Sequence, residues 1–402
     1  MDIINREYYT QRITNAFGKG LIIALTGQRR VGKSYIMLQI INEIKAKENA
    51  NVIYVNLDYD KFSGLKTHIE LSQYVEENLL EGKDNYFFAD EIQNVKEFEK
   101  TLRNLHAQNL CHIMITGSNA KMLSGELTTF LSGRCIEYHI QSLSFKEFLL
   151  FHNLPNSQES LAKYLQFGGL PQLRTIGLDN TSLIDDYLEG IYNMIVLKDV
   201  IEREDIRNVP LLKDLLRFTA DNIGKQFSAN KIVGFLKNQN IVTSSKAILS
   251  YLEYLSNAFI INKVPRYDIH GKRLFELNDK YYFEDLGLRN KIIGGNRRAD
   301  IEKVIENAVY LHLKHLGYTV NVGQFMKAEI DFVAEKKGQT IYIQVTYLLA
   351  TQETIDMEFG NLKIIKNSFP KYVISMDTLF GDTNDEGIRH INLLDFLNMD
   401  NL

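Results

Sequence analysis

The stretch Gly27-Gln28-Arg29-Arg30-Val31-Gly32-Lys33-Ser34 decides the fold of this chain, because it matches the pattern GxxxxGK[ST] in full. It follows the apolar run Leu21-Ile22-Ile23-Ala24-Leu25 and precedes a helical pattern over 34–47, which predicts a strand, a tight loop and a helix. In such a loop the glycines let the backbone curl around a phosphate, and amides at the start of the helix point at its oxygens. We therefore predict a nucleotide site built from Gly27 to Ser34 and Tyr35, with Lys33 on the β- and γ-phosphates and Ser34 on Mg²⁺.

An acidic pair ends a second apolar run, in Tyr86-Phe87-Phe88-Ala89-Asp90-Glu91. A carboxylate of this kind holds the Mg²⁺ of the bound nucleotide in P-loop enzymes, and we predict that role for Asp90, through water. Glu91 is then the expected general base for an attacking water molecule, which would make the chain a hydrolase. The alternative is that the pair only places negative charge at the start of the following helix.

Two further predicted strands end in polar residues. Asn56-Leu57-Asp58 ends a strand between the loop and the acidic pair, and Thr116-Gly117-Ser118-Asn119 ends the strand after that pair. An additional strand at this place, together with a catalytic glutamate, is the layout of one class of P-loop ATPases. We expect Ser118 or Asn119 to sense the γ-phosphate, and the alternative is that they cap the next helix. Asp58 is a further candidate for the same site.

Arg134 precedes another apolar run, Cys135 to Ile140. An arginine at this place would reach the γ-phosphate of its own subunit or of a neighbouring subunit and offset the charge that spreads in the transition state. The alternative is a solvated loop residue. The first interpretation predicts a homo-oligomer if the contact crosses between subunits.

Apolar runs and helical patterns alternate over the first 140 residues. Beyond the runs quoted above, strands are expected at 52–57, 112–116 and 135–140, and a helix is expected at 95–108. Short, continuous apolar runs separated by helices indicate strands that are buried on both faces. The predicted fold class is therefore α/β with a parallel sheet, in a P-loop ATPase domain over residues 1–140.

The composition is that of a globular chain with several domains. Its 402 residues are 24% charged, with 46 Lys and Arg against 50 Asp and Glu, a net charge of −4. Single cores stop growing at roughly 250–300 residues, so two or three domains are expected. The apolar runs are far shorter than the roughly 18 residues that span a bilayer, and the first residues lack a signal-peptide pattern, which predicts a cytoplasmic protein with no membrane contact.

The motifs resemble those of the AAA-like archaeal and bacterial ATPases, which have an N-terminal P-loop domain and a C-terminal domain of unknown function. Besides the phosphate loop, the resemblance rests on Phe88-Ala89-Asp90-Glu91-Ile92-Gln93, Thr116-Gly117-Ser118-Asn119, Leu131-Ser132-Gly133-Arg134, Leu143-Ser144-Phe145-Lys146-Glu147-Phe148, Gly168-Gly169-Leu170-Pro171 and Ile195-Val196-Leu197-Lys198-Asp199-Val200. It covers essentially the whole chain. It implies ATP as the nucleotide, a winged-helix segment, and a C-terminal module shaped like a restriction endonuclease.

Residues 141–209 form a predicted helical connector, and residues 210–298 follow the pattern of a winged helix. Three helical stretches precede two strand-like pieces, 259–267 and 273–277. The third helix is expected to bury one apolar stripe, which consists of Ile248, Leu249, Leu252 and Leu255.

The winged-helix segment is basic although the whole chain is not. Its 15 basic and 8 acidic residues give a net charge of +7, and the 31 basic and 42 acidic residues elsewhere give −11. Lys246 on the third helix, and Arg266, Lys272 and Arg273 in the wing, are therefore candidate contacts to DNA phosphates. The alternative is that the winged helix is an internal strut or contacts a protein partner.

The last predicted domain, 299–402, carries part of a nuclease site. Restriction endonucleases gather Mg²⁺ with a helix Glu, a strand Asp and an (E/Q)xK motif, for which Glu306, Asp331 and Gln344 are the counterparts here. The lysine of that motif is replaced by Thr346, so Lys327 or Lys336 would have to supply the cation. We therefore expect a degenerate site, in a fold kept for binding or shape rather than for cleavage.

Together these observations predict an ATP-binding, Mg²⁺-dependent ATPase that acts as a nucleotide-driven switch. The switch would be coupled to a winged-helix and nuclease-like region that contacts DNA or a protein partner. The alternatives are an active metal-dependent DNA nuclease gated by ATP, a kinase for a small acceptor, and an ATP-binding scaffold without hydrolysis.

Overall fold

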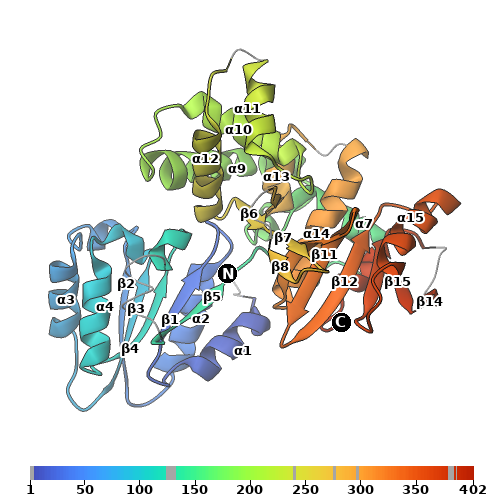
Figure 1. The fold of residues 1–402 in the computed structure, drawn as a ribbon. Helices are drawn as coiled ribbons and strands as arrows, with labels where there is room; N and C mark the ends of the chain where they lie inside the picture. The colour runs from blue at the N-terminus through green and yellow to red at the C-terminus, as the bar shows by residue number, and fades with distance from the viewer. Residues whose placement is uncertain are drawn as a thin grey trace. The chain divides into compact units, whose positions relative to one another are not determined.

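A computed structural model describes residues 4–123, 133–238, 241–274, 278–295, 298–378, 384–385 and 387–402 (Figure 1). The chain forms two compact units, one made of residues 1–141 with 257–259 and the other of residues 142–256 with 260–402. Leu131 and Ser132 of the motif that contains Arg134, and residues 275–277 of a predicted strand, lie outside the described residues. Among the described residues, no helix is both long and apolar enough to cross a membrane.

The first unit contains a sheet of five strands in the order β2-β3-β4-β1-β5, and every neighbouring pair is parallel. The strands are β1 (Ile22–Thr26), β2 (Ala50–Asn56), β3 (Asp84–Asp90), β4 (His112–Thr116) and β5 (Cys135–His139). All five residues of β1 are buried, as expected for a strand covered on both faces. The predicted α/β class with a parallel sheet is confirmed.

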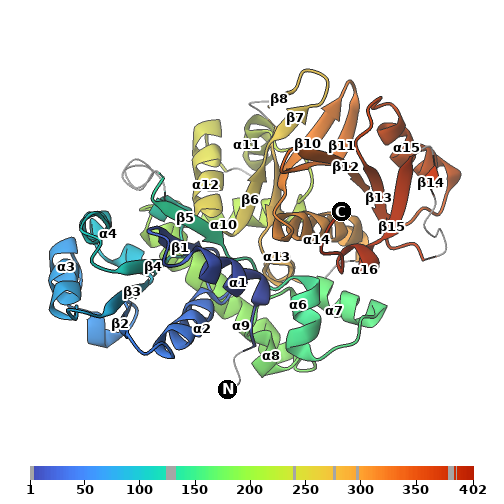
Figure 2. The same cartoon turned by 90° about the horizontal axis from the view of Figure 1, so that it is seen from below.

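Helices cover both faces of this sheet (Figure 2). They are α1 (Glu7–Ala16), α2 (Lys33–Lys45), α3 (His68–Glu77) and α4 (Phe98–Ala107). Side chains of α3 and α4, such as Leu71 and Leu102, form one core with Ile22 and Phe87 of the sheet. In both views α1 and α2 lie on the opposite side.

A shared edge follows from the parallel arrangement. The carboxyl ends of β1, β2, β3 and β4 meet at one side of the sheet, where parallel sheets bind ligands. The last residues of these strands are Thr26, Asn56, Asp90 and Thr116. The predicted phosphate loop, the acidic pair and the polar strand ends are therefore brought together.

The second unit begins with helices and a small sheet. Its helices are α6 (Phe145–His152), α7 (Gln158–Phe167), α8 (Leu173–Ile176), α9 (Thr181–Met194), a π-helix η4 (Ile195–Glu202), α10 (Val209–Asp221), α11 (Ala229–Lys237), α12 (Ser245–Asn257) and α13 (Leu286–Ile292). Strand β6 (Ile261–Val264) pairs antiparallel with β9 (Lys280–Phe283).

The motif Gly168-Gly169-Leu170-Pro171 has no evident chemistry in the sequence, and its two glycines have a packing role in the structure. Gly168 has φ +75°, and a Cβ atom there would collide with the Asp285 carboxylate. The next amide, of Gly169, donates to Asp285 Oδ2 at 2.8 Å. Asp285 also caps α13, because Leu288 N donates to its Oδ1 at 3.0 Å. The glycines thus let the end of α7 pack directly on the start of α13.

An eight-stranded sheet in the order β14-β15-β13-β12-β11-β10-β7-β8 completes the second unit. Its strands are β7 (Arg266–Asp268), β8 (Arg273–Leu274), β10 (Thr319–Phe325), β11 (Ala328–Lys336), β12 (Gln339–Val345), β13 (Lys371–Ser375), β14 (Asn384–Asp385) and β15 (Ile388–Asn392). The helices α14 (Ile301–His315), α15 (Gln352–Lys363) and α16 (Leu393–Phe396) accompany it. The predicted hairpin in this region is present as β11 and β12, which are antiparallel.

The structure differs from the predicted wing. The piece 259–267 is divided at Pro265 into β6 and β7, which enter different sheets. Strand β7 pairs parallel with β10, so the β7–β8 hairpin extends the eight-stranded sheet instead of standing apart from it (Figure 2). Leu249, which was expected in the apolar stripe of α12, is 52% exposed, whereas Ile248, Leu252 and Leu255 are buried.

Candidate active site

The phosphate loop joins β1 to α2 in a conformation that requires its glycines. Gly27 has φ +136° and lies so close to the Ile140 carbonyl that no Cβ would fit, and Gly32 has φ +101° immediately before the first helical residue. Lys33 is buried, and its ammonium donates to the carbonyls of Gly27 and Gln28 at 2.8 and 2.9 Å. The cation is thus held inside the loop, and its contact with the β- and γ-phosphates stays a prediction.

The remaining loop residues differ in exposure. Val31 and Gln28 are fully buried, and the Gln28 amide has no hydrogen-bond partner among the described residues. Arg30 is exposed, with φ +70°. The Tyr35 side chain is half exposed, and its place in the nucleotide site stays a prediction.

Asp90 ends β3 as a buried carboxylate with several donors. Thr116 donates its hydroxyl to Oδ1, and Asn56 Nδ2 donates to Oδ2 at 3.1 Å. Burial raises the pKa of Asp90 above its ordinary value, although hydrogen bonds from Thr116 and Ser34 oppose that shift. The contact with Ser34 brings together the two residues predicted to hold Mg²⁺.

The oxygens at this place fit Mg²⁺ bound together with a nucleotide. Across the described part of the chain, no group of three or more His, Cys, Asp and Glu side chains is arranged to hold a metal ion alone. Mg²⁺ in nucleotide sites needs only one or two carboxylates, because phosphates and waters supply the other ligands. Ser34 and Asp90 meet that requirement.

Glu91 follows Asp90 in a left-handed conformation, with φ +56°. Its carboxylate accepts hydrogen bonds from Gln93 and, at 3.1 Å, from the Ser118 hydroxyl. Burial raises the pKa of Glu91. The charges of Lys33 and Arg29 and the two hydrogen bonds lower it by more than burial raises it, so the net shift is downward. The carboxylate is therefore ionised at neutral pH, as a general base must be.

Thr116 contacts both members of the acidic pair, and the sequence analysis did not single it out. Its hydroxyl donates to Asp90 and accepts the backbone N–H of Glu91 at 3.0 Å. Asn56 and Gln93 were missed in the same way. The signal that points to Thr116 and Asn56 is their position as the last residues of strands next to β3.

Ser118 and Asn119 occupy distinct places, although the sequence offers them as alternatives. Ser118 is buried and donates to Glu91. Asn119 is 2% exposed, and its Oδ1 accepts the Lys121 amide at 2.7 Å. The Asn119 Nδ2 has no hydrogen-bond partner among the residues described, so it is a donor available for a ligand.

Arg134 does not belong to this edge of the sheet. Its carbonyl accepts the amide of Ile22, the first residue of β1, whereas the phosphate loop follows the last residue of that strand. At about 3.3 Å per residue, Ile22 at the start of β1 and Gly27 at the start of the loop are about 16 Å apart, which is farther than an arginine side chain reaches. The interpretation that Arg134 contacts the nucleotide of its own subunit is therefore wrong.

Asp58 contacts the loop but not its phosphate-binding amides. It accepts from Asn94 Nδ2 at 3.0 Å, and Arg29 Nη1 lies 3.8 Å from its Oδ2. The Asp58 side chain is 50% exposed, and its partners Arg29 and Asn94 come from two different segments. Asp58 therefore connects the phosphate loop to the segment after β3 at the surface.

Comparison with known proteins agrees with this geometry. Residues 19–149 match the AAA domain family, and residues 158–299 match a domain of unknown function (DUF8612). An uncharacterized protein of Haemophilus influenzae is 34% identical over 404 residues, which cover 98% of each chain. The uncharacterized protein MJ1544 of Methanocaldococcus jannaschii is 32% identical over 86% of this chain and 78% of its own length.

The chain belongs to this family of AAA-domain proteins. Among solved structures, the Walker-type ATPase PABY2304 of Pyrococcus abyssi is similar with a TM-score of 0.49 and 17% identity, over 72% of this chain and 96% of that one.

The second unit of this AAA-domain protein brings the predicted nuclease-like residues together. Gln344 Oε1 accepts the backbone N–H of Asp331 at 2.8 Å, and Gln344 Nε2 donates to Glu358 at 2.9 Å. A cation is also present, but it is Lys280 of β9, whose Nζ lies 3.0 Å from Glu306 Oε1 and 3.6 Å from Asp331 Oδ1.

The expectation that Lys327 or Lys336 would supply this cation is therefore wrong. Lys327 is exposed, and the Lys336 ammonium lies 5.3 Å from the centre of the Tyr318 ring. Lys280 was missed because β9 precedes the predicted nuclease-like domain, and only the three-dimensional fold places it beside α14 and β11.

The four DNA-contact candidates of the AAA-domain protein are not equivalent. Lys246 and Lys272 are exposed. Arg273 is 75% exposed, with its Nε 3.8 Å from Asp268. Arg266 is half-buried and donates to Gln324 Oε1 at 2.6 Å. This hydrogen bond joins β7 to β10 within the eight-stranded sheet. Arg266 is therefore the least exposed of the four candidates.

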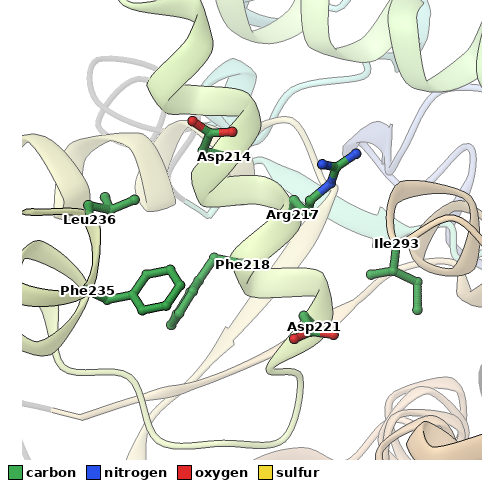
Figure 3. A pocket seen from close by; sticks show the side chains of 7 residues that line it. All are labelled: Asp214, Arg217, Phe218, Asp221, Phe235, Leu236 and Ile293. Atoms are coloured by element: carbon green, nitrogen blue, oxygen red, sulfur yellow. The ribbon is translucent and has the colours of Figure 1, made fainter. Parts of the chain in front are cut away.

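A separate cavity of about 320 Å³ lies between α10 and α11 (Figure 3). The rings of Phe218 and Phe235 lie 5.2 Å apart on one side of it. Among the described residues that line it, Arg217 is the one cation, and Asp214 and Asp221 are carboxylates. Because acidic groups outnumber basic ones, this cavity is a poor match for a DNA phosphate.

Proposed function

We propose that this protein binds ATP with Mg²⁺ and hydrolyses it, with Glu91 as the general base. The observation that carries the proposal is the Glu91 carboxylate, which is buried, kept ionised, and held by Ser118 and Gln93 beside the phosphate loop. An ionised carboxylate that is fixed in place can orient and deprotonate one water molecule, whereas a mobile, solvated carboxylate does not hold a water molecule in one orientation.

Each residue then has a defined part in the reaction. Glu91 takes a proton from water as the water oxygen attacks the γ-phosphorus, and the bond from that phosphorus to the β–γ bridging oxygen breaks. Lys33 and the Asn119 amide offset the negative charge on the γ-phosphate oxygens. Ser34 and, through water, Asp90 would hold Mg²⁺, which supplies further charge neutralisation when it is bound with the nucleotide.

We further propose that ATP binding and hydrolysis act as a switch on the second unit, which contacts DNA or a protein partner. The basic segment 210–298 supports DNA, because three of its exposed cations, Lys246, Lys272 and Arg273, can reach phosphates. Arg134 would take part from a neighbouring subunit, because its own loop is out of reach.

The test is a comparison of Glu91→Gln with Lys33→Ala in ATP binding and in phosphate release, with and without single- and double-stranded DNA. Glu91→Gln should bind ATP and release no phosphate, and Lys33→Ala should not bind ATP. A Glu91→Gln variant that hydrolyses ATP at the wild-type rate would show that the assigned base is wrong. If the wild type releases no phosphate under any condition, the protein is better explained as an ATP-binding scaffold without hydrolysis. Transfer of labelled phosphate from ATP to a small acceptor would favour a kinase.

A further inference from the structure

The Lys280 ammonium lies among three carboxylates that come from two other elements. Its Nζ is 2.8 Å from Glu329 Oε1, 3.0 Å from Glu306 Oε1 and 3.6 Å from Asp331 Oδ1. Glu306 belongs to α14, and the other two carboxylates belong to β11. The Lys280 side chain is 2% exposed, so this cation is inside the protein and not on its surface.

The carboxylate oxygens around Lys280 also have other partners within the second unit. Tyr282 donates its hydroxyl to Glu306 Oε1 at 2.5 Å. The Gln226 amide donates to Glu329 Oε2, and the Val345 amide donates to Asp331 Oδ2 at 2.8 Å. A divalent cation such as Mg²⁺ would need several of these oxygens at about 2.0–2.1 Å, and it would compete for them with the ammonium that already lies among them.

Gln344, the third predicted metal ligand, is occupied as well. Its Oε1 accepts the Asp331 N–H at 2.8 Å and its Nε2 donates to Glu358 at 2.9 Å, so both ends of the side chain already contact protein groups. The side chain therefore connects β12 to β11 and α15 instead of facing a metal position.

The backbone keeps Lys280 in this place. Val264 of β6 pairs with Lys280, so the strand that carries the lysine is fixed in a sheet. Asn307, which follows Glu306 on α14, accepts the Phe283 amide at 2.7 Å and donates to the Phe283 carbonyl at 2.9 Å. These bonds set the position of β9 relative to α14, and the ammonium cannot leave the carboxylates by a simple movement of the strand.

We propose that Lys280 takes the place of the divalent cation in this nuclease-like site and turns it into an internal ionic lock. The lock joins β9 to α14 and β11, so that the basic segment and the C-terminal sheet hold together without metal. The residues present do not fit a metal, because the charge that a metal would supply is already provided by the chain.

The test uses the full-length protein without nucleotide and measures Mn²⁺ binding by electron paramagnetic resonance, together with the Tm. The wild type and Asp331→Asn should bind the same amount of Mn²⁺, because neither has a site at these carboxylates. Lys280→Ala should melt at a lower temperature, gain one Mn²⁺ per chain and recover part of its Tm in Mn²⁺. The double variant Lys280→Ala/Asp331→Asn should lose that gain.

Two outcomes would overturn the proposal. One is Mn²⁺ binding by the wild type that Asp331→Asn removes, since the site would then take a metal with Lys280 in place. This comparison does not depend on whether Lys280→Ala folds. The other is a folded Lys280→Ala variant that melts like the wild type and binds no additional Mn²⁺. That result would mean that Lys280 neither stabilises the second unit nor occupies the position of a metal ion.

Discussion

The Thr116 hydroxyl accepts the backbone N–H of Glu91 at 3.0 Å. The same oxygen donates to the Asp90 carboxylate, so one side chain sets the orientation of both acidic residues. Glu91 has a left-handed backbone, which is unfavourable for a residue with a side chain, and the contact with Thr116 helps to stabilise it.

Replacement of Thr116 by Val should therefore reduce catalysis without removing ATP binding. Val keeps the shape of the side chain and removes the hydroxyl, and loss of a group that orients metal-site residues typically costs about 10- to 100-fold. We expect kcat to fall by that factor and KM for ATP to change little. Thr116→Ser is the matched control, and it should stay within a few-fold of the wild type; equal losses in both variants would contradict the hydroxyl's role.

Ser118 and Asn119 should give different pH profiles. Glu91 acts as a base only when it is ionised, so activity falls as the pH drops through its pKa. Ser118 helps to lower that pKa, and Ser118→Ala should raise the pKa of Glu91 and move the loss of kcat to higher pH. Asn119→Ala should lower kcat over the whole range without moving the acidic limb, because Asn119 does not contact Glu91 among the described contacts.

If Ser118→Ala leaves the acidic limb in place, then Ser118 does not hold the base. If Asn119→Ala leaves kcat unchanged, then the free amide does not sense the γ-phosphate.

The part of this site that was predictable is the part that local sequence encodes. Lys33 and Ser34 follow from the loop pattern, and Asp90 and Glu91 follow from an apolar run that ends in two acids. The role of Thr116 depends on β4 lying between β1 and β3, a neighbour relation that no local pattern contains. Lys280 is harder still, because its three carboxylates come from segments that lie 26 or more residues further along the chain.

The wing shows a different limit, because its hairpin was predictable and the sheet that the hairpin joins was not. The strand-like character of residues around Arg266 was correct, but β7 pairs with β10, more than fifty residues away. The predicted pairing of this strand with the next piece of chain is present as the β7–β8 hairpin, whereas the division at Pro265 places β6 in another sheet.

Gly168→Ala should destabilise the protein more than Gly177→Ala does. Both glycines have positive φ, +75° and +82°, with ψ of −165° and +132°, a backbone region that residues with a side chain rarely adopt, so both substitutions have a similar backbone cost of about 1–3 kcal/mol. Only at Gly168 would the new Cβ collide with Asp285, whereas nothing lies within 4 Å of it at Gly177. We expect an additional loss of about 1–3 kcal/mol for Gly168→Ala in urea unfolding. Equal losses would mean that the α7–α13 contact can relax.

Arg134 should act between subunits. Because about 16 Å of β1 separates it from its own loop, Arg134→Ala should lose ATPase activity only in an assembled protein. Mixing Arg134→Ala with Glu91→Gln should then restore part of the activity, since one variant supplies the base and the other supplies the arginine. Full activity of Arg134→Ala alone, or no recovery in the mixture, would contradict a role between subunits.

Binding to duplex DNA should depend on three exposed cations and not on Arg266. The triple variant Lys246→Ala/Lys272→Ala/Arg273→Ala removes three candidate phosphate contacts, and each one lost should reduce the slope of log K against log salt by about 0.9. The matched control is Lys327→Ala/Lys337→Ala/Lys366→Ala, which removes the same charge from exposed positions elsewhere in the second unit. Arg266→Ala should change the salt slope little, because Arg266 is half-buried and donates to Gln324 Oε1. Equal weakening by both triple variants would indicate a general charge effect, and it would favour a protein partner for the basic segment.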